Sequence, residues 1–411
     1  MKFNKNQWAW ISYDFANSAF HLLIPTILFP LFFKSVINTT EKSDLYWSLT
    51  ISIPVLIAGI IAPFLGAFLD KKSTQKRSFV FTVLGAIAFN FLLGFIGIGN
   101  VTIYTIVFIL CMLFFSLSQF TYDSFIVTHS TEKQFAKLSG YGWGIGYLGG
   151  ILCILPIMAL ISNKTLPSDY QTYQLCFIIV ASFYLVFSLP SLFLIKPVEV
   201  LSETELNPVR KVFFSLRKFK ENRNIFIFVI AFYLINDGLS TLVYFTSIFA
   251  SETVGLTSKE ILMSFLLVQL VAVPATIIFC SVSEKIGYLK VFVTSVFLWI
   301  IIGFLFYIVS TTPQFYVLSV IVGLVIGTTP AMARAILAKY LQNRKDFTEF
   351  FGFNAFASRA SSIIGPLLFG IISVTTGSKK IAILSISLFF ISGLVTLWFL
   401  KDAKELEVVE G

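Results

Sequence analysis

The sequence predicts an all-α membrane protein, with twelve transmembrane helices in two pseudo-symmetric six-helix bundles. Of its 411 residues, 57% are hydrophobic and only 12% are charged, whereas a soluble domain has about 25% charged residues. Each predicted span is long enough to cross a bilayer core, which takes about 20 residues. The twelve spans cover residues 8–33, 46–69, 78–97, 101–122, 138–161, 173–195, 225–249, 260–282, 289–310, 315–338, 350–376 and 381–400.

The first apolar run is expected to stay in the protein as a helix. It is too long for a cleavable signal peptide, contains Asp14 and lacks a small-residue cleavage site. The cysteines lie in separate spans, where a thiol is usually a small buried hydrophobic group. Their positions, Cys111, Cys153, Cys176 and Cys280, predict neither a disulfide nor a metal site, and we expect no cofactor.

Lysine and arginine residues indicate the orientation, because they accumulate in cytoplasmic loops. With the N-terminus inside, 22 of the 30 Lys and Arg residues fall on the cytoplasmic side. This predicts an integral multi-pass protein of the cell inner (plasma) membrane with both termini cytoplasmic. The net charge of +9 is then a topology signal, and without a soluble basic domain it does not indicate nucleic acid binding.

The longest segment between spans, residues 196–224, divides the chain into an N-terminal bundle, 1–195, and a C-terminal bundle, 225–411. Asn207 and Pro208 within it are typical of a helix start, and apolar residues at helical spacing follow beside basic ones. We therefore expect a basic amphipathic helix lying on anionic lipids of the inner leaflet. The alternative is a solvated charged linker.

The two halves share a loop signature after their second spans. Residues 66–77 read GAFLDKKSTQKR and residues 280–290 read CSVSEKIGYLK. Together with twelve spans, this pattern resembles the major facilitator superfamily, in which an acid followed by a basic residue stands at the cytoplasmic end of the helix. These residues, for which we expect a gating or structural role, are Asp70, Lys71, Glu284 and Lys285.

Four longer strings narrow the resemblance. They are YDFANSAF at 13–20, SGYGWGIGYLGG at 139–150, AFYLINDGLST at 231–241 and FFGFNAFASRASSIIGP at 350–366. They are similar to the vacuole effluxer-like, autophagy-related family within that superfamily. The resemblance implies proton-linked or facilitated movement of small solutes, with neutral amino acids the best-known class. Where the family usually has Gln-Ala-x-Ser-Arg-Ser, this chain reads PAMARA, so Arg334 is kept and its polar neighbours are lost.

Four ionisable residues lie inside the apolar runs, namely Asp14, Asp237, Arg334 and Arg359. A charge at the centre of a membrane helix costs roughly 2.5–3.5 kcal/mol on insertion scales, so such residues usually mark a pathway, a relay or an internal ion pair. Two acids and two bases cancel. A net-neutral site of this kind suits a small zwitterion.

Polar residues follow one face of the first and of the seventh span, at helical spacing. The resemblance implies that these two spans line the central cavity, and transporter sites generally lie near the midplane at the repeat interface. The Ser, Thr and Asn positions are equally compatible with hydrogen bonds between helices, whereas the two Asp residues favour the cavity. The predicted substrate or proton site comprises Asp14, Asn17, Ser18, His21, Gln119, Asp237, Ser240, Thr241, Tyr244 and Arg359.

The four charges are expected to have different roles. Arg359 is about as deep in its span as Asp237, and the superfamily places these spans side by side, so we expect an ion pair. Arg334 either braces a cytoplasmic gate near Glu284 or contacts substrate. Asp14 has no base clearly beside it and is the first candidate for proton exchange, since desolvation tunes carboxyl groups for that task.

Several neighbouring residues leave alternatives open. His21 either joins a proton relay or makes an ordinary helix contact. Asp123 lies close enough to the cytoplasm to be simply solvated. The aromatic residues Tyr122, Trp143 and Tyr147 either pack against an apolar part of the substrate or belong to the core or lipid face.

Glycines follow one face of the fifth span at Gly142, Gly146 and Gly150. Small residues at this spacing let helices approach closely. We expect this face to be a packing or hinge element that slides against the other half.

These features predict a secondary active transporter of a small solute by alternating access, with or without proton coupling. A neutral amino acid or related zwitterion is the expected substrate. The alternatives are an exporter of bulkier amphiphiles, such as drugs or siderophores, and a non-transporting membrane sensor. An enzyme is not expected, because catalytic sites cluster His, Cys or carboxylates and the chain has only two His residues.

Overall fold

The computed structural model describes residues 3–37, 40–69, 74–97, 100–129, 135–161, 170–196, 223–341 and 364–400. Within these ranges every regular element is a helix, and eleven helices are long and apolar enough to cross a membrane. The eleventh predicted span, 350–376, is represented by the shorter apolar helix Ile364–Thr376, because residues 350–363 lie outside the described ranges. The predicted all-α, twelve-span fold is confirmed.

The first predicted span, 8–33, is longer in the structure and changes its helical form. It begins earlier because Asn4 and Gln7 form a capping box at its N-terminus, which satisfies backbone donors that a helix start leaves free. Pro25 and Pro30 lie in its second half, where the missing N–H donors of proline favour wider π-turns. The span consists of α1 (Lys5–Leu23), η1 (Ile24–Leu28), α2 (Phe29–Phe32) and η2 (Phe33–Ile37).

The other helices follow the predicted order. The N-terminal group continues with α3 (Ser43–Leu69), α4 (Thr74–Leu93), α5 (Val101–His129), α6 (Phe135–Ile161) and α7 (Tyr170–Leu194). The C-terminal group comprises α9 (Arg223–Phe249), η5 (Ala250–Val254), α10 (Ser258–Ile286), α11 (Tyr288–Ile308), α12 (Thr312–Val325), α13 (Thr328–Leu341), α15 (Ile364–Thr376) and α16 (Lys379–Trp398). The predicted span 315–338 is broken, because the chain turns at residues 326–327 between α12 and α13.

Two glycines permit the sharp connections in this group. Gly255 ends η5 at φ 78° and Gly287 joins α10 directly to α11 at φ 103°. Side chains larger than glycine rarely adopt such angles. The Gly287 of the loop signature therefore serves a one-residue turn between two spans.

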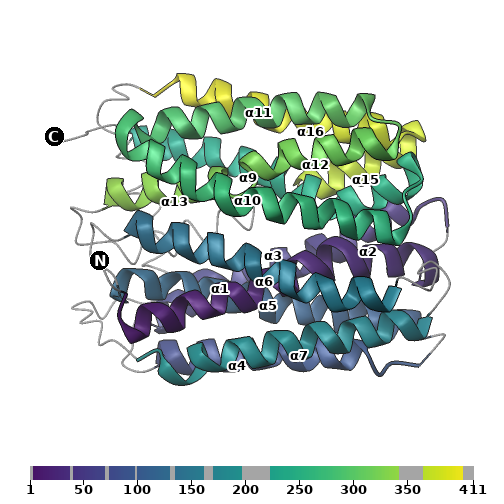
Figure 1. The fold of residues 1–411 in the computed structure, drawn as a ribbon, viewed down its shortest axis with the longest axis horizontal. Coiled ribbons are helices and arrows are strands. Elements are labelled where there is room, and N and C mark those ends of the chain that lie inside the picture. Colours follow the sequence, from purple (N-terminus) through teal and green to yellow (C-terminus); the bar gives the residue numbers. More distant parts are fainter. Residues whose placement is uncertain are drawn as a thin grey trace.

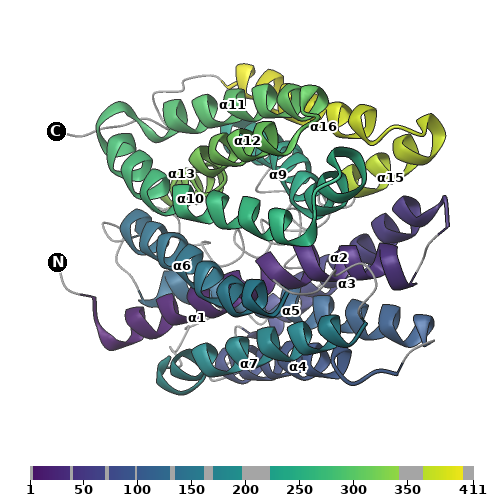
Figure 2. The same ribbon diagram turned by 45° about the vertical axis from the view of Figure 1, so that its right-hand side comes forward.

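The helices lie in two groups side by side, with the purple and blue helices in one and the green and yellow helices in the other (Figures 1 and 2). The groups meet where α3 packs on α15 and α6 packs on α10. The predicted boundary at 196–224, and the basic helix expected there, fall almost wholly in residues 197–222, outside the described ranges. Both remain predictions.

The glycines of α6 serve close packing. A Cβ atom on Gly142 would lie 2.2 Å from Asp14 Oδ2, and one on Gly149 would lie 2.0 Å from the Phe15 carbonyl oxygen. Gly146 likewise faces Ser18 on α1. Gly142 and Gly146 therefore pack on α1 within their own group, whereas Gly150 faces both Leu22 of α1 and Gln269 of α10 in the other group. The predicted sliding of this face against the other half stays a prediction.

Large apolar side chains are exposed around the bundle. Trp398 is 88% exposed, Phe193 75% and Phe81 67%. Soluble monomers rarely present extensive apolar surface to water. Contact with lipid explains these positions, as the composition requires.

Candidate functional site

The carboxylate of Asp14 is buried within α1 and is only partly satisfied. Its Oδ1 atom accepts a long hydrogen bond of 3.4 Å from Asn17 Nδ2. Its Oδ2 atom has no hydrogen-bond partner among the described residues. Asn17 Nδ2 also donates to Gln119 Oε1 on α5 at 3.1 Å, so the structure brings three of the predicted site residues together.

Aromatic residues and a glycine enclose this carboxylate. Trp10 stacks on Tyr122 at 4.5 Å between ring centroids and donates from Nε1 to the Tyr122 carbonyl oxygen at 3.2 Å. The Trp10 ring also lies 2.9 Å from where a Cβ on Gly142 would stand. Gly142 is therefore needed to leave room for both Asp14 and Trp10.

Further buried polar atoms on α5, α6 and α10 have no hydrogen-bond partner among the described residues. On α5 and α6 they are Tyr122 OH, Trp143 Nε1 and Tyr147 OH, and on α10 they are Gln269 Oε1 and Thr276 Oγ1. Buried polar groups are nearly always paired, so unpaired atoms gathered in one region suggest a place for a ligand or water. The central polar cluster comprises Asp14, Tyr122, Trp143, Tyr147, Gln269 and Thr276.

This cluster extends across the boundary between the two helix groups. A Cβ atom on Gly327, at the break between α12 and α13, would lie 2.7 Å from Tyr147 OH and 2.1 Å from Thr276 Oγ1. Gln269 likewise faces Gly150 of α6. Gln269 and Thr276 were not among the predicted site residues. A single polar residue in an apolar run does not indicate which neighbouring helix it faces.

His21 and Tyr244 lie where α1 approaches α9. The His21 ring is 6.1 Å from the Tyr244 ring and 6.0 Å from that of Phe115. Ser18 faces Gly146 instead, and Ser240 is half-buried on α9. The polar residues predicted on one face of α1 therefore have different surroundings: His21 lies toward α9, and Ser18 packs against α6.

Asp237 is almost completely buried and lies apart from Asp14, against the start of α15. Its Oδ2 atom accepts a hydrogen bond of 2.9 Å from the backbone N–H of Gly365, and Oδ1 has no partner among the described residues. Thr241 donates to the Asp237 carbonyl oxygen at 2.7 Å. Arg359 lies outside the described ranges, so its predicted ion pair with Asp237 stays a prediction.

Arg334 joins α13 to two helices of the other group. It pairs with Asp123 on α5 at 3.1 Å, donates to Ser139 on α6 at 3.2 Å and lies 5.8 Å from the centre of the Trp143 ring. We expected Asp123 to be simply solvated and missed this pair. A bracing role beside Glu284 stays untested, because the Glu284 side chain is not described.

The other predicted gating residues add little to this picture. Asp70 and Lys71 lie outside the described ranges. Lys285 is exposed at the end of α10. Among the described residues, no three His, Cys, Asp or Glu side chains group in a way that would hold a metal ion.

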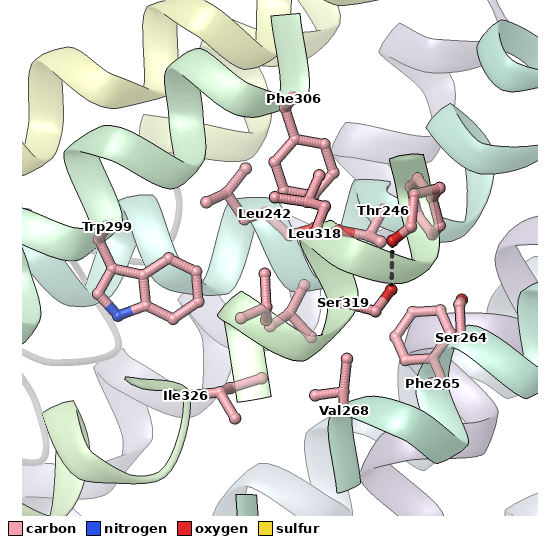
Figure 3. A pocket seen from close by; sticks show the side chains of 13 residues that line it. Leu242, Thr246, Ser264, Phe265, Val268, Trp299, Phe306, Leu318, Ser319 and Ile326 are labelled. Carbon is pink, nitrogen blue, oxygen red and sulfur yellow. Dashed lines mark hydrogen bonds between the residues drawn. The ribbon is translucent and has the colours of Figure 1, made fainter. Parts of the chain in front are cut away.

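An apolar cavity lies within the C-terminal group, among α9, α10, α11 and α12 (Figure 3). Its walls include Leu242, Phe265, Trp299 and Phe306. The hydroxyl of Ser319 at its edge donates to a carbonyl oxygen of its own helix. The cavity offers no charge and does not lie between the groups, so it is a weaker candidate than the central polar cluster.

The fold is that of a major facilitator superfamily transporter. The chain is similar to the crystal structure of the transporter FucP in its outward conformation, with a TM-score of 0.69, 14% sequence identity and coverage of 96% of this chain and 98% of that one. At this identity the similarity shows the fold alone. The protein is thus an integral, multi-pass membrane transporter of this class.

The chain belongs to the family described as vacuole effluxer Atg22 like, whose model matches residues 41–407. An uncharacterized MFS-type transporter of Bacillus subtilis, YxiO, is 28% identical over 421 residues, covering 99% of this chain and 97% of that protein. Autophagy-related protein 22 of Saccharomyces cerevisiae is 22% identical over 277 residues, covering 58% of this chain and 52% of that protein. The family predicted from the four strings is confirmed.

Proposed function

We propose that this transporter moves a small zwitterion, in the first instance a neutral amino acid, by alternating access at the central polar cluster. The observation that carries the proposal is the Asp14 carboxylate, buried with one oxygen unpartnered among the described residues. An unpaired buried charge is unfavourable by several kcal/mol. A ligand ammonium group would complete its hydrogen bonds.

The groups around Asp14 suit the other end of a zwitterion. Trp143 Nε1 and Tyr147 OH are donors without acceptors among the described residues. A ligand carboxylate would accept from such donors, and charge-assisted hydrogen bonds of this kind are among the stronger ones. Arg334, which contacts the Trp143 ring, adds a positive charge at the same wall.

Proton coupling follows from the same carboxylate. When the ammonium group leaves, a proton on Asp14 would keep the site neutral, which makes return of the empty transporter less costly. Asp237, also buried with an unpartnered oxygen among the described residues, is the second candidate. Proton and ammonium would then compete for one carboxylate.

We also propose that both termini are cytoplasmic and that the protein resides in the plasma membrane. The support is the excess of Lys and Arg in the segments that this orientation places inside. The predicted basic helix in the linker would then contact anionic lipids of the same leaflet.

The test is uptake by proteoliposomes containing the purified chain. A panel of radiolabelled neutral amino acids is assayed with and without an outward proton gradient, in which the lumen is acidic, beside a bulky amphiphile and protein-free liposomes. We expect saturable uptake of at least one amino acid, increased by the gradient. Transport of the amphiphile alone would refute the amino acid proposal and favour the exporter.

A further inference from the structure

Four charged residues meet where η2 and α3 of the N-terminal group approach η5 and α16 of the C-terminal group. The neighbouring helices α2 and α15 are labelled on the side of the bundle opposite the chain termini in Figure 1. Lys34 is in η2 and Asp44 is in the first turn of α3, both in the N-terminal group. Glu252 is in η5 and Lys379 is in the first turn of α16, both in the C-terminal group. The predicted spans ended just short of all four, so each had the position of an ordinary loop charge.

Each lysine contacts both acids, and the contacts close a ring. Lys34 Nζ binds Asp44 Oδ1 and lies 3.1 Å from Glu252 Oε1. Lys379 Nζ lies 3.3 Å from Asp44 Oδ2 and 2.7 Å from Glu252 Oε2. We refer to Lys34, Asp44, Lys379 and Glu252, in this order, as the four-charge ring.

The ring joins the two helix groups. Two of its pairs cross between them, namely Lys34 with Glu252 and Lys379 with Asp44. Ser373 of α15 adds a cross-group hydrogen bond of 2.5 Å to Asp44. Deeper in the molecule, Trp47 Nε1 donates across the same boundary to the Tyr244 carbonyl oxygen at 3.4 Å, so this end of the molecule is closed.

The other two pairs of the ring lie within the groups. Lys34 pairs with Asp44 inside the N-terminal group, and Lys379 pairs with Glu252 inside the C-terminal group. If the groups separated, each would keep one neutral pair. No charge would then be left without a partner. This matters because the Asp44 side chain is only 5% exposed and the Lys34 side chain only 12%. Separating a buried ion pair is unfavourable because it leaves a buried charge without a partner. In this arrangement each charge keeps one partner when the groups separate.

We propose that the four-charge ring is a reversible latch, which holds this end of the transport pathway shut and opens into two neutral pairs when the groups part. The latch rests on alternating access between the two groups, and it is independent of which solute is carried. Cross-group attraction favours the closed state, and the pairs within the groups keep the open state accessible. The two contributions can be separated by exchanging charges around the ring.

Two double variants have the same net charge and opposite expected effects. Lys34→Asp with Asp44→Lys keeps the pairs within the groups and makes both cross-group pairs repulsive, so the latch should open. Asp44→Lys with Lys379→Asp keeps both cross-group attractions and makes the pairs within the groups repulsive, so the latch should stay shut. Each variant is therefore the matched control of the other.

The measurement is the distance between spin labels at Glu41 and Thr311, two exposed positions on either side of this end. The chain is reconstituted in lipid nanodiscs after its four cysteines are replaced. We expect the first variant to raise the ratio of long to short distances roughly tenfold, since two attractions become repulsions. The second variant should show the wild-type short distance.

Identical distance distributions in wild type and both variants, or opening in both, would overturn the latch. If a reversed pair does not fold, Lys34→Gln with Asp44→Asn removes both cross-group pairs, leaves Lys379 paired with Glu252 and should shift the label distances to longer values; no shift would count against the latch. Lys42→Glu, an exposed charge reversal nearby, should leave the distances unchanged. Because label distances need no solute, failed amino acid uptake would refute the proposed substrate and not the latch.

Discussion

Asp14 combines burial with an incomplete set of hydrogen bonds. A carboxylate has about four acceptor sites, yet this one receives a single long bond from Asn17 among the described residues. The unpartnered oxygen, Oδ2, faces Gly142 of α6. At the scale of single residues, the tests therefore concern this carboxylate and the glycine that makes room for it.

Replacing Asp14 by Asn should weaken solute uptake strongly. A hydrogen bond to a charged group contributes about 1.5–3 kcal/mol, so the apparent affinity should fall roughly tenfold or more, and stimulation by a proton gradient should disappear. Initial rates in proteoliposomes measure both. Glu41→Gln removes the same charge at an exposed site and should leave uptake unchanged. Equal rates in Asp14→Asn and wild type would exclude Asp14 as the binding group.

Gly142 should not tolerate even a methyl group. Gly142→Ala would bring Cβ to 2.2 Å from Asp14 Oδ2 and 2.9 Å from the Trp10 ring, and overpacking of this kind destabilises by about 1–3 kcal/mol. The matched control is Gly144→Ala on the same helix, where Cβ would meet Ile277 at an ordinary 3.5 Å. Thermal unfolding in detergent should show a lower midpoint for Gly142→Ala alone. Equal midpoints would contradict the close packing of α1 on α6.

Helix α13 is the element that connects the groups at the end where the termini lie. It is separated from α12 by the turn at residues 326–327, and its Arg334 contacts α5 and α6 of the other group. Discontinuous helices are common at transporter sites, where the ends of half-helices point at substrate or ion groups. We infer that α13 shifts relative to α12 when this end opens.

The pair of Arg334 with Asp123 should be weak but specific. The two side chains are 21% and 44% exposed, and exposed pairs contribute about 0.2–1 kcal/mol. Arg334→Asp and Asp123→Arg should each lower the unfolding midpoint, and the double exchange should recover part of the loss. Additive losses in a double-mutant cycle would mean that Arg334 acts through Ser139 and Trp143 instead.

At the scale of the whole molecule, the two groups are connected at both ends. The four-charge ring closes one end, and Arg334 reaches across near the other. Between them α3 packs on α15 and α6 on α10. Alternating access requires that the contacts at one end break while those at the other end persist. The four-charge ring and the contacts of Arg334 must therefore stabilise their closed ends by similar free energies.

The orientation of the whole protein can be tested in cells. In a cysteine-free background, single cysteines at Glu41 or Thr311 should react with a membrane-impermeant maleimide added outside. A cysteine at Lys285, at the exposed end of α10, should react only after the membrane is permeabilised. The reverse labelling pattern would invert the proposed topology and place the four-charge ring on the cytoplasmic side.

The order of helices and the family were predictable because both are local in the chain. A run of about 20 apolar residues has few options other than crossing the membrane, and the four strings identified the family directly. Asp14, Asn17 and Gln119 had each been selected as site residues, and the structure joins them by hydrogen bonds. The ion pair of Asp123 was harder to predict, because the position of a charge near the end of a span does not indicate whether it is solvated or pairs with an arginine.

The sequence by itself therefore determined the membrane class, the helical spans and the acids buried within them, because hydropathy and helical period depend only on neighbouring residues. Only the tertiary structure decided which polar atoms meet across helices. It joined Lys34 and Asp44 to Glu252 and Lys379, residues that lie far apart in the chain. It also directed the Gly142 face onto α1. The physical reason is that these contacts depend on the rotation and depth of each helix, which packing sets and composition does not record.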